Sequence, residues 1–256
     1  MTVEHSVGSR RIKGQLDSSK RNAKEFLTHG EDGKWTFRRS DIRDYQATFG
    51  DLLLPHFNSF ESVVKELKAA NNSVFALDLM SFGAALRDLH ELDGGISIGL
   101  HDIRVEDETT HDRFHNLSFH AGDVLANETW SFMQNWISSQ RPELPYFDLI
   151  FCRPLGGYLS IREEHYIPYV FGLRKIFRLL NPNGGIALIQ LPITKEKFDE
   201  GNIRKLLKLN NLHREPQIKI APTSRCPNFR FYGENLFIQN PLLQEGEHES
   251  KDREHD

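Results

Sequence analysis

The stretch Val74–Ala85, with the sequence VFALDLMSFGAA, decides the fold predicted for this chain. It begins as a short apolar run that ends on an acidic residue, Asp78, and continues through Leu79–Gly83 into the helix-like pattern AALRDLHEL. A short apolar run bounded by turn residues is typical of a strand buried in a parallel sheet. Because ligands of open α/β sheets bind beyond the carboxyl ends of the strands, the turn after Asp78 is the first candidate for a site.

The composition is that of a globular protein with a sizeable core. The chain has 256 residues, of which 38% are hydrophobic and 27% charged, and it contains 18 Phe. A net charge of −4 argues against a protein built wholly around a phosphate backbone. Two cysteines form no disulfide framework, and no apolar run approaches the ~18 residues of a membrane span. The N-terminus lacks the apolar core of a secretory signal, so we expect a soluble, cytoplasmic protein without membrane contact.

Three regions are predicted along the chain. Residues 1–40 are polar with mixed charge, which indicates a flexible N-terminal arm, with a basic arm that contacts nucleic acid or an acidic partner as the alternative. Residues 41–240 are predicted to form one α/β domain that opens with helices at 40–57 and 58–72. Residues 241–256 are charged and are expected to be a disordered tail.

Strand-like and helix-like segments alternate after residue 73. Strands are predicted at 74–79, 96–103, 117–123, 146–154, 185–192, 213–221 and 228–239. Helices are predicted at 84–92, 129–139, 162–180 and 196–211. This alternation favours a parallel sheet, and the lack of a helix between the last two strands implies an antiparallel hairpin there. We also expect Asp93–Gly95 to close the helix at 84–92.

The helix predicted at 129–139 has an apolar side. The residues expected to face inward are Trp130, Phe132, Met133, Trp136 and Ile137.

This order of elements resembles that of the class I S-adenosylmethionine-dependent methyltransferases, whose sheet ends in a reversed strand seven. The resemblance covers roughly residues 58–240. Its most specific part is LRKIFRLLNPNGGIALIQLP, at 173–192, which is similar to the helix, Gly-rich turn and strand that follow the family's fourth motif. The segment FDLIFCRPLGG, at 147–157, resembles the fourth motif itself. The implied fold is α/β, a doubly wound Rossmann-like seven-stranded mixed sheet with a C-terminal antiparallel hairpin.

The resemblance also implies a cofactor, S-adenosyl-L-methionine, and residues that bind it. Asp78 stands where the first motif ends its strand, and Asp102 lies near the acid that holds the ribose hydroxyls. Asp123 looks like the acid that reads the adenine amino group. The cofactor-binding residues implied in this way are Asp78, Met80, Gly83, Asp102, Asp123, Val124 and Cys152.

The first motif departs from the family pattern. The family's glycines would fall at Met80, Phe82 and Ala84, and Gly83 is one position out of register. Glycine lets the backbone approach the methionine part of the cofactor, so bulky side chains there would redirect the cofactor or fill its place. An alternative function is therefore a catalytically inactive protein of the same fold that acts as a binding or regulatory partner.

The acids at the strand ends also have a structural interpretation. Asp78 and Asp123 each precede a predicted helix, where an acid can cap the first backbone N–H groups. The joint placement of three acids at the ends of three successive strands favours ligand binding. His101 is adjacent to Asp102, and either side chain can point into the site.

The methyl acceptor is left open as a small molecule, a protein or RNA, and so is the oligomeric state. Arg153 and Pro154, in the fourth-motif segment, are the candidates for substrate contact, and no catalytic residue is identified. The Asn/Asp-Pro-Pro-aromatic sequence of the family's amino-group enzymes is absent, which disfavours methylation of exocyclic amines in DNA. Cys152 is interpreted as a buried inert cysteine rather than a nucleophile, because the expected Pro-Cys order is missing.

Two other site classes are disfavoured. The spacing of His111, His115 and His120 fits neither a zinc pattern nor a calcium loop, so no metal is predicted. A nicotinamide-dependent dehydrogenase would need a G-x-G-x-x-G turn after the first strand, and that turn is missing.

Overall fold

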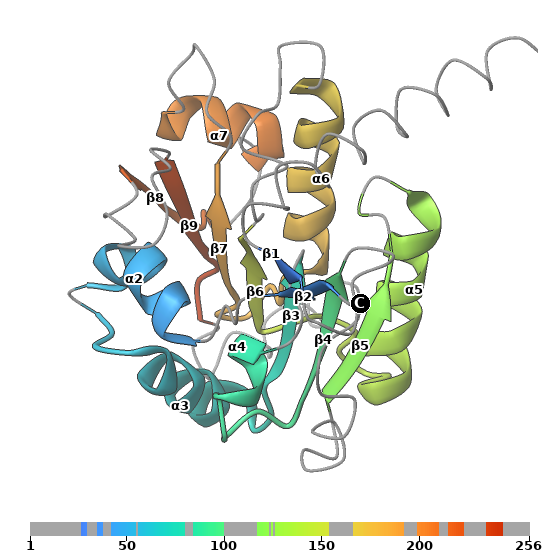
Figure 1. The fold of residues 1–256 in the computed structure, drawn as a ribbon. Coiled ribbons are helices and arrows are strands. Elements are labelled where there is room, and N and C mark those ends of the chain that lie inside the picture. Colours follow the sequence, from blue (N-terminus) through green and yellow to red (C-terminus); the bar gives the residue numbers. More distant parts are fainter. Residues whose placement is uncertain are drawn as a thin grey trace, which may run out of the picture.

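The structure is a computed structural model of the chain, drawn in Figure 1. It describes residues 27–29, 35–37, 42–54, 56–79, 84–99, 117–122, 124, 126–153, 166–191, 199–209, 215–222 and 234–242.

A mixed seven-stranded sheet forms the centre of the fold. Its strands are β3 (Phe75–Leu79), β4 (Gly94–Gly99), β5 (Leu117–Ala121), β6 (Leu149–Cys152), β7 (Ile186–Gln190), β8 (Gln217–Pro222) and β9 (Glu234–Gln239). They lie in the order β5-β4-β3-β6-β7-β9-β8, and β9 pairs antiparallel with both of its neighbours. The other pairs are parallel. The predicted mixed sheet and its C-terminal antiparallel hairpin are confirmed, as is the reversed strand that the resemblance implies.

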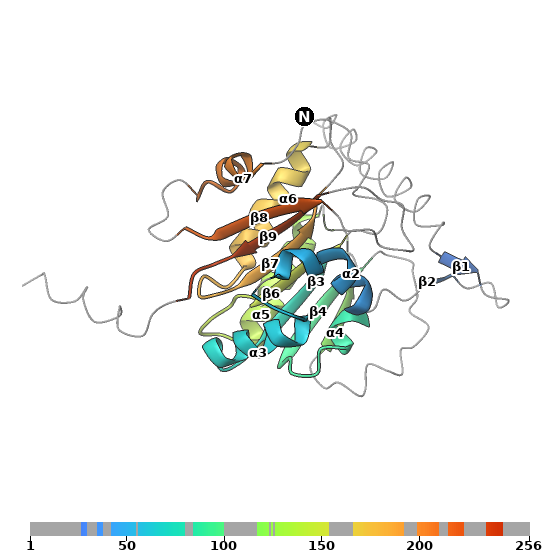
Figure 2. The same cartoon turned by 90° about the vertical axis from the view of Figure 1, so that its left-hand side faces the viewer.

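Helices cover both faces of this sheet. They are α2 (Ile42–Leu53), α3 (Phe60–Asn71), α4 (Ala84–Arg87), α5 (Asn127–Gln140), α6 (Tyr166–Leu179) and α7 (Glu200–Leu207). One apolar core joins the sheet to α2, α3 and α4, and the other joins it to α5, α6 and α7. Figure 2 shows α2, α3 and α4 in front of the sheet, with α5 and α6 behind it. Because both faces are covered, every residue of β3 and β7 is buried.

Helix α3 precedes β3 and is capped at both ends. Ser59 caps α3 through a reciprocal pair: its hydroxyl accepts from the backbone N–H of Ser62 at 3.2 Å, and its N–H donates to the Ser62 hydroxyl at 3.1 Å. Asn72 ends the helix in the left-handed region, with φ of 61°. The chain then turns directly into the first strand of the sheet.

The prediction for the segment after β3 was partly wrong. The helix expected at 84–92 spans only Ala84–Arg87, and Gly94 and Gly95 begin β4 instead of closing the helix. A Cβ at Gly95 would lie 3.1 Å from Leu86 Cδ1 and 3.2 Å from the carbonyl oxygen of Ala76. Glycine therefore lets the strand pass close beneath α4, which the sequence pattern alone did not indicate.

The inward face of α5 was also predicted with one error. Trp130, Met133 and Ile137 are buried, as expected from their i, i+3 and i+7 spacing. Phe132 is instead 37% exposed. It lies off that stripe and stacks on His120, with ring centroids 3.8 Å apart.

The predicted arm contains a described pair of strands. The strands β1 (Leu27–His29) and β2 (Trp35–Phe37) pair antiparallel in a sheet of their own. The remainder of the arm, and the tail beyond residue 242, lie outside the described residues. Among the helices described, none is long and apolar enough to cross a membrane.

Candidate functional site

The strand order creates a topological switch point between β3 and β6. From β3 the chain moves outward through β4 and β5, then returns to β6 on the other side of β3. Ligands of open α/β sheets bind beyond the carboxyl ends of the strands at such a point. The register pairs Asp78 with Phe151 and Leu79 with Cys152, so Asp78, Cys152 and the following Arg153 lie at this carboxyl edge.

These three predicted site residues do not share one face of the sheet. Asp78 and Arg153 contact α2, on the face covered by α2, α3 and α4. Cys152 packs into the apolar core of the opposite face, with α5, α6 and α7. The alternation of side chains along β6 places Cys152 and Arg153 on opposite sides. The structure therefore places Asp78 and Arg153 on one face of the sheet and Cys152 on the other.

Asp78 is a fully buried carboxylate held by a tyrosine. Its exposed fraction is 0%, and the Tyr45 hydroxyl lies 2.9 Å from Oδ1 and 3.1 Å from Oδ2. Tyr45 comes from α2, and 1% of it is exposed. Ser97 of β4 is the register partner of Asp78 and is 1% exposed. A buried charge without polar partners would be costly, so the Tyr45 hydroxyl stabilises Asp78 in place.

Arg153 is tied to the same helix. Its Nε donates to Thr48 Oγ1 at 3.0 Å, and its Cζ lies 5.3 Å from the centroid of the Tyr45 ring. Asn235, the second residue of β9, donates from Nδ2 to the Thr48 carbonyl at 2.7 Å. We call Tyr45, Thr48, Asp78, Arg153 and Asn235 the α2 network. All five residues are buried, so α2 joins three strands of the carboxyl edge through polar contacts.

Two buried polar atoms at this edge have no hydrogen-bond partner among the described residues. They are Ser97 Oγ, beside Asp78, and Asn235 Oδ1, within the α2 network. An unpaired buried donor or acceptor typically costs about 1–3 kcal/mol. Buried polar groups of this kind are uncommon in folded proteins and occur at functional sites. The carboxyl ends of the strands therefore carry polar atoms that no contact among the described residues uses.

Cys152 is chemically inert in this environment. Burial, together with the negative charge of Asp78, raises the pKa of its thiol to about 12. The thiolate is the nucleophilic form of cysteine, so Cys152 carries almost none of it at neutral pH. This supports its interpretation as a buried structural cysteine.

The inertness of Cys152 is testable with a thiol reagent. In a Cys226→Ser variant, which leaves Cys152 as the only thiol, we expect no reaction with Ellman's reagent at pH 8 in the native protein. We expect one thiol to react after denaturation, because unfolding exposes it to water and removes the effect of Asp78. Rapid reaction of the folded variant would contradict the buried placement.

Val124 lies in the turn after β5, and its backbone is fixed from α5. The indole Nε1 of Trp130 donates to the Val124 carbonyl at 2.7 Å. Lys175 of α6 lies over the same indole ring, at 5.3 Å from its centroid, and donates to Asn127 Oδ1 at 2.8 Å. Burial lowers the pKa of Lys175, while the charge of Glu128 opposes this change. Trp130 thus braces the turn that carries the predicted adenine-reading segment, a role that sequence reasoning missed.

The other predicted site residues fall outside the part of the chain that the structure describes. They are Met80, Gly83, Asp102, Asp123 and Pro154. Their roles stay predictions. Within the described ranges, no group of three His, Cys, Asp or Glu side chains is placed to hold a metal ion.

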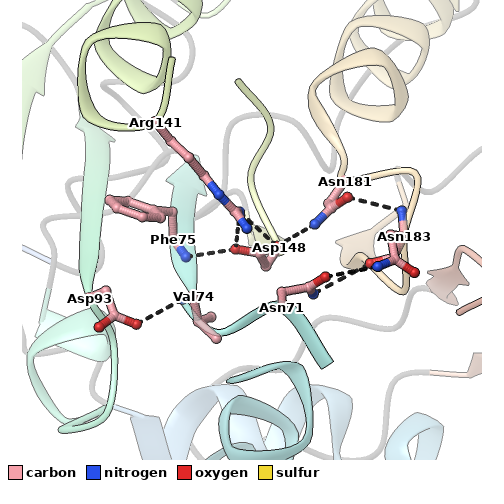
Figure 3. A network of polar contacts seen from close by, with 8 residues as sticks. All are labelled: Asn71, Val74, Phe75, Asp93, Arg141, Asp148, Asn181 and Asn183. Carbon is pink, nitrogen blue, oxygen red and sulfur yellow. Dashed lines mark hydrogen bonds and ion pairs between the residues drawn. The ribbon is translucent and has the colours of Figure 1, made fainter. Parts of the chain in front are cut away.

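A second polar network lies at the amino ends of β3 and β6, around Asp148 (Figure 3). The carboxylate of Asp148 is fully buried and accepts from the N–H of Phe75 at 2.9 Å and from Nη1 of Arg141 at 3.0 and 3.1 Å. It also accepts from the side-chain amide of Asn181. Burial raises the pKa of Asp148, and these hydrogen bonds and the Arg141 charge act in the opposite direction.

This amino-edge network connects elements that are distant in sequence. Asn181 Oδ1 accepts from the backbone N–H of Asn183 at 2.9 Å, and Asn183 Nδ2 donates to Asn71 Oδ1 of α3 at 3.1 Å. Asp93 accepts from the N–H of Val74 at 2.8 Å (Figure 3). The network lies at the edge opposite the switch point. We therefore interpret it as a brace of the fold and the α2 network as part of the candidate site.

Comparisons with known proteins were made by sequence and by structure. No protein-family model matches the sequence, and no curated protein matches it. The N-methyltransferase NodS from Bradyrhizobium japonicum is similar in structure, with 13% identity, a TM-score of 0.43 and coverage of 71% of this chain and 94% of that chain. The 1,6-didemethyltoxoflavin-N1-methyltransferase of Burkholderia thailandensis is also similar in structure, with 14% identity and a TM-score of 0.43. The similarity covers 84% of this chain and 95% of that chain.

A third similar structure is spermidine synthase from Thermotoga maritima. It has 10% identity and a TM-score of 0.41, with coverage of 83% of this chain and 64% of that chain. These identities and TM-scores are low, so the assignment of the fold rests on the strand order and strand directions described above.

Proposed function

We propose that this chain is an S-adenosylmethionine-dependent methyltransferase of the class I type, with its cofactor beyond the carboxyl ends of β3, β4 and β5. The observation that carries the proposal is the switch point between β3 and β6, with buried Asp78 at its edge, in a sheet whose strand β9 is reversed. Ligand binding at such a point is a general property of doubly wound sheets. The reversed strand is the feature that the resemblance to methyltransferases implies.

The polar groups at this edge fit such a ligand. Asp78 and Ser97 are register neighbours on β3 and β4, and the Ser97 hydroxyl has no hydrogen-bond partner within the described ranges. A nucleoside with an amino-acid arm presents many hydrogen-bonding groups, whereas an apolar ligand would give the Ser97 hydroxyl no partner. Asp102 and Asp123 are proposed to hold the ribose and the adenine.

The chemistry asks the protein mainly to position two reactants. When bound, the cofactor supplies a methyl group on a sulfonium, which passes to a nucleophile of the acceptor in line while the sulfur keeps the electron pair. Holding donor and acceptor aligned can supply much of the rate enhancement of such a displacement. The α2 network and the Trp130 brace are the described features that fix the geometry of this edge. The acceptor is proposed to be a small molecule, a protein or RNA.

Calorimetric titration with S-adenosylhomocysteine tests the proposal. We expect binding, and at one hundred times the Kd the ligand should stabilise the fold by about 2.7 kcal/mol. Asp102→Ala and Asp123→Ala should each weaken binding about 10-fold or more, since each removes a charged hydrogen-bond partner. Asp51→Ala is the matched control, because Asp51 lies on the exposed side of α2, and it should leave the affinity unchanged.

Two other results of this titration would favour a different function. If millimolar S-adenosylhomocysteine gives neither heat nor a thermal shift, the methyltransferase activity is excluded. That result would favour the alternative, a catalytically inactive protein that serves as a binding or regulatory partner. Met80 and Phe82 are the residues that motivate this alternative. Binding of NADH in place of S-adenosylhomocysteine would instead favour a dehydrogenase.

A further inference from the structure

The helix α2 makes buried polar contacts with residues at the carboxyl ends of the strands. Tyr45 and Thr48 are three residues apart, so they lie on the same side of the helix. Tyr45 contacts Asp78 at the end of β3, and Thr48 contacts Arg153 at the end of β6. One helix therefore holds the charged side chains on both sides of the switch point.

The Tyr45 hydroxyl constrains the orientation of the Asp78 carboxylate. It lies within hydrogen-bond distance of both oxygens, at 2.9 and 3.1 Å, so rotation of the carboxyl group would break the contact. The phenol ring is itself held by edge contacts to Phe49, at 6.3 Å and 62°, and to Phe151, at 5.2 Å and 84°. The hydroxyl cannot follow a rotating carboxylate without repacking these rings.

The fixed Asp78 carboxylate lies where ligands of open α/β sheets bind. Asp78 stands at the switch point, and its register neighbour Ser97 has a buried hydroxyl that finds no partner in the described part of the chain. The contact between Tyr45 and Asp78 does not account for this hydroxyl, because Ser97 lies on the neighbouring strand. A carboxylate held for a ligand explains both features, because functional sites keep polar groups that the fold does not satisfy.

We propose that Tyr45 is a positioning residue of the cofactor site: its hydroxyl holds the Asp78 carboxylate in the orientation that receives a hydrogen-bond donor of the bound cofactor. This inference rests on the function proposed above. It makes α2, which precedes the first strand of the sheet, a necessary part of the site. Ligand affinity then depends on a side chain that need not touch the ligand.

The test is a double-mutant cycle on the Kd for S-adenosylhomocysteine, measured by calorimetry on the full chain. Tyr45→Phe removes only the hydroxyl and keeps the ring packing, and we expect it to weaken binding about 10-fold. Asp78→Asn should weaken binding at least as much. If Tyr45 acts through Asp78, the double variant should bind within about 2-fold of Asp78→Asn alone, because coupled residues are not additive.

A control separates positioning from simple loss of stability. Asn71→Ala removes an amide pair with Asn183 at the opposite edge of the sheet, so it should lower the thermal midpoint without changing the Kd. If Asp78→Asn does not fold, Tyr45→Phe against Asn71→Ala decides the question, with folding checked by circular dichroism.

The outcomes distinguish the two proposals. Wild-type binding with an unchanged Kd in Tyr45→Phe would overturn the positioning role alone, as would additive losses in the double variant. Absence of wild-type binding would overturn the proposed function and the role of Tyr45 with it.

Discussion

Replacement of Asp148 by alanine should lower the free energy of unfolding by about 3–5 kcal/mol, the usual cost of removing one partner from a buried ion pair. The carboxylate is 0% exposed and receives donors from Arg141, Asn181 and the backbone of Phe75. Its loss would leave an arginine that is 12% exposed without its counter-charge and two further donors without an acceptor. Chemical denaturation followed by fluorescence of the three tryptophans measures the effect.

A matched variant shows whether burial is the cause. Asp199→Ala removes the exposed cap of α7, whose carboxylate accepts from the N–H of Asn202 at 2.8 Å. Loss of a helix cap typically costs about 1 kcal/mol, well below the cost of the buried pair. In addition, Asp148→Ala combined with Arg141→Met should cost less than the sum of the single changes, since the second change removes the stranded charge. Equal effects of the two aspartate variants would refute the bracing role of the amino-edge network.

Replacement of Phe151 by alanine is the second change with a large expected effect, a loss of about 3–5 kcal/mol in the free energy of unfolding. Phe151 is 0% exposed on the α2–α4 face of β6. It makes edge contacts with Tyr45, at 5.2 Å, and with Phe60 of α3, at 5.1 Å. Its removal would open a cavity where both helices dock on the sheet, because the surrounding residues relax only partly.

Phe132→Ala is the control of the same chemistry. Phe132 is 37% exposed, so its truncation should cost less than about 1 kcal/mol. Urea unfolding of the two variants gives the comparison directly. A similar loss in both would mean that Phe151 does not anchor α2 and α3. Because Phe151 supports the Tyr45 ring, its truncation should also weaken any ligand affinity that depends on Asp78.

The central sheet could be predicted from the sequence because a strand that is buried on both faces appears as a continuous apolar run. The runs VFALDL and GIALIQLP are apolar over their whole length, and each becomes a fully buried parallel strand, β3 and β7. The closing hairpin followed from the missing helix between the last two strands. The short α4 was not predicted, since the pattern AALRDLHEL continues at helical spacing past the point where the chain turns toward β4.

The candidate site could be predicted only at its strand ends. Asp78 was identified as the acid that ends an apolar run, and Cys152 and Arg153 from the resemblance to the family's fourth motif. The structure places all three at the carboxyl ends of β3 and β6. Their division between the two faces was not predicted, because the resemblance grouped Asp78 with Cys152 as cofactor residues. Tyr45 and Asn235 were missed entirely. No local motif marks them, since Tyr45 lies 33 positions from Asp78 and Asn235 lies 187 positions from Thr48.

What the sequence by itself determined is therefore the alternation of strands and helices, the reversed hairpin and the acid at the end of the first strand of the sheet. Each of these depends on the periodicity of neighbouring residues, which any stretch of chain carries locally. Only the tertiary structure decided which carboxylates become buried, which helix holds them and which edge is a brace. Those outcomes depend on the packing of segments far apart in the chain, because a buried charge persists only where distant donors converge on it.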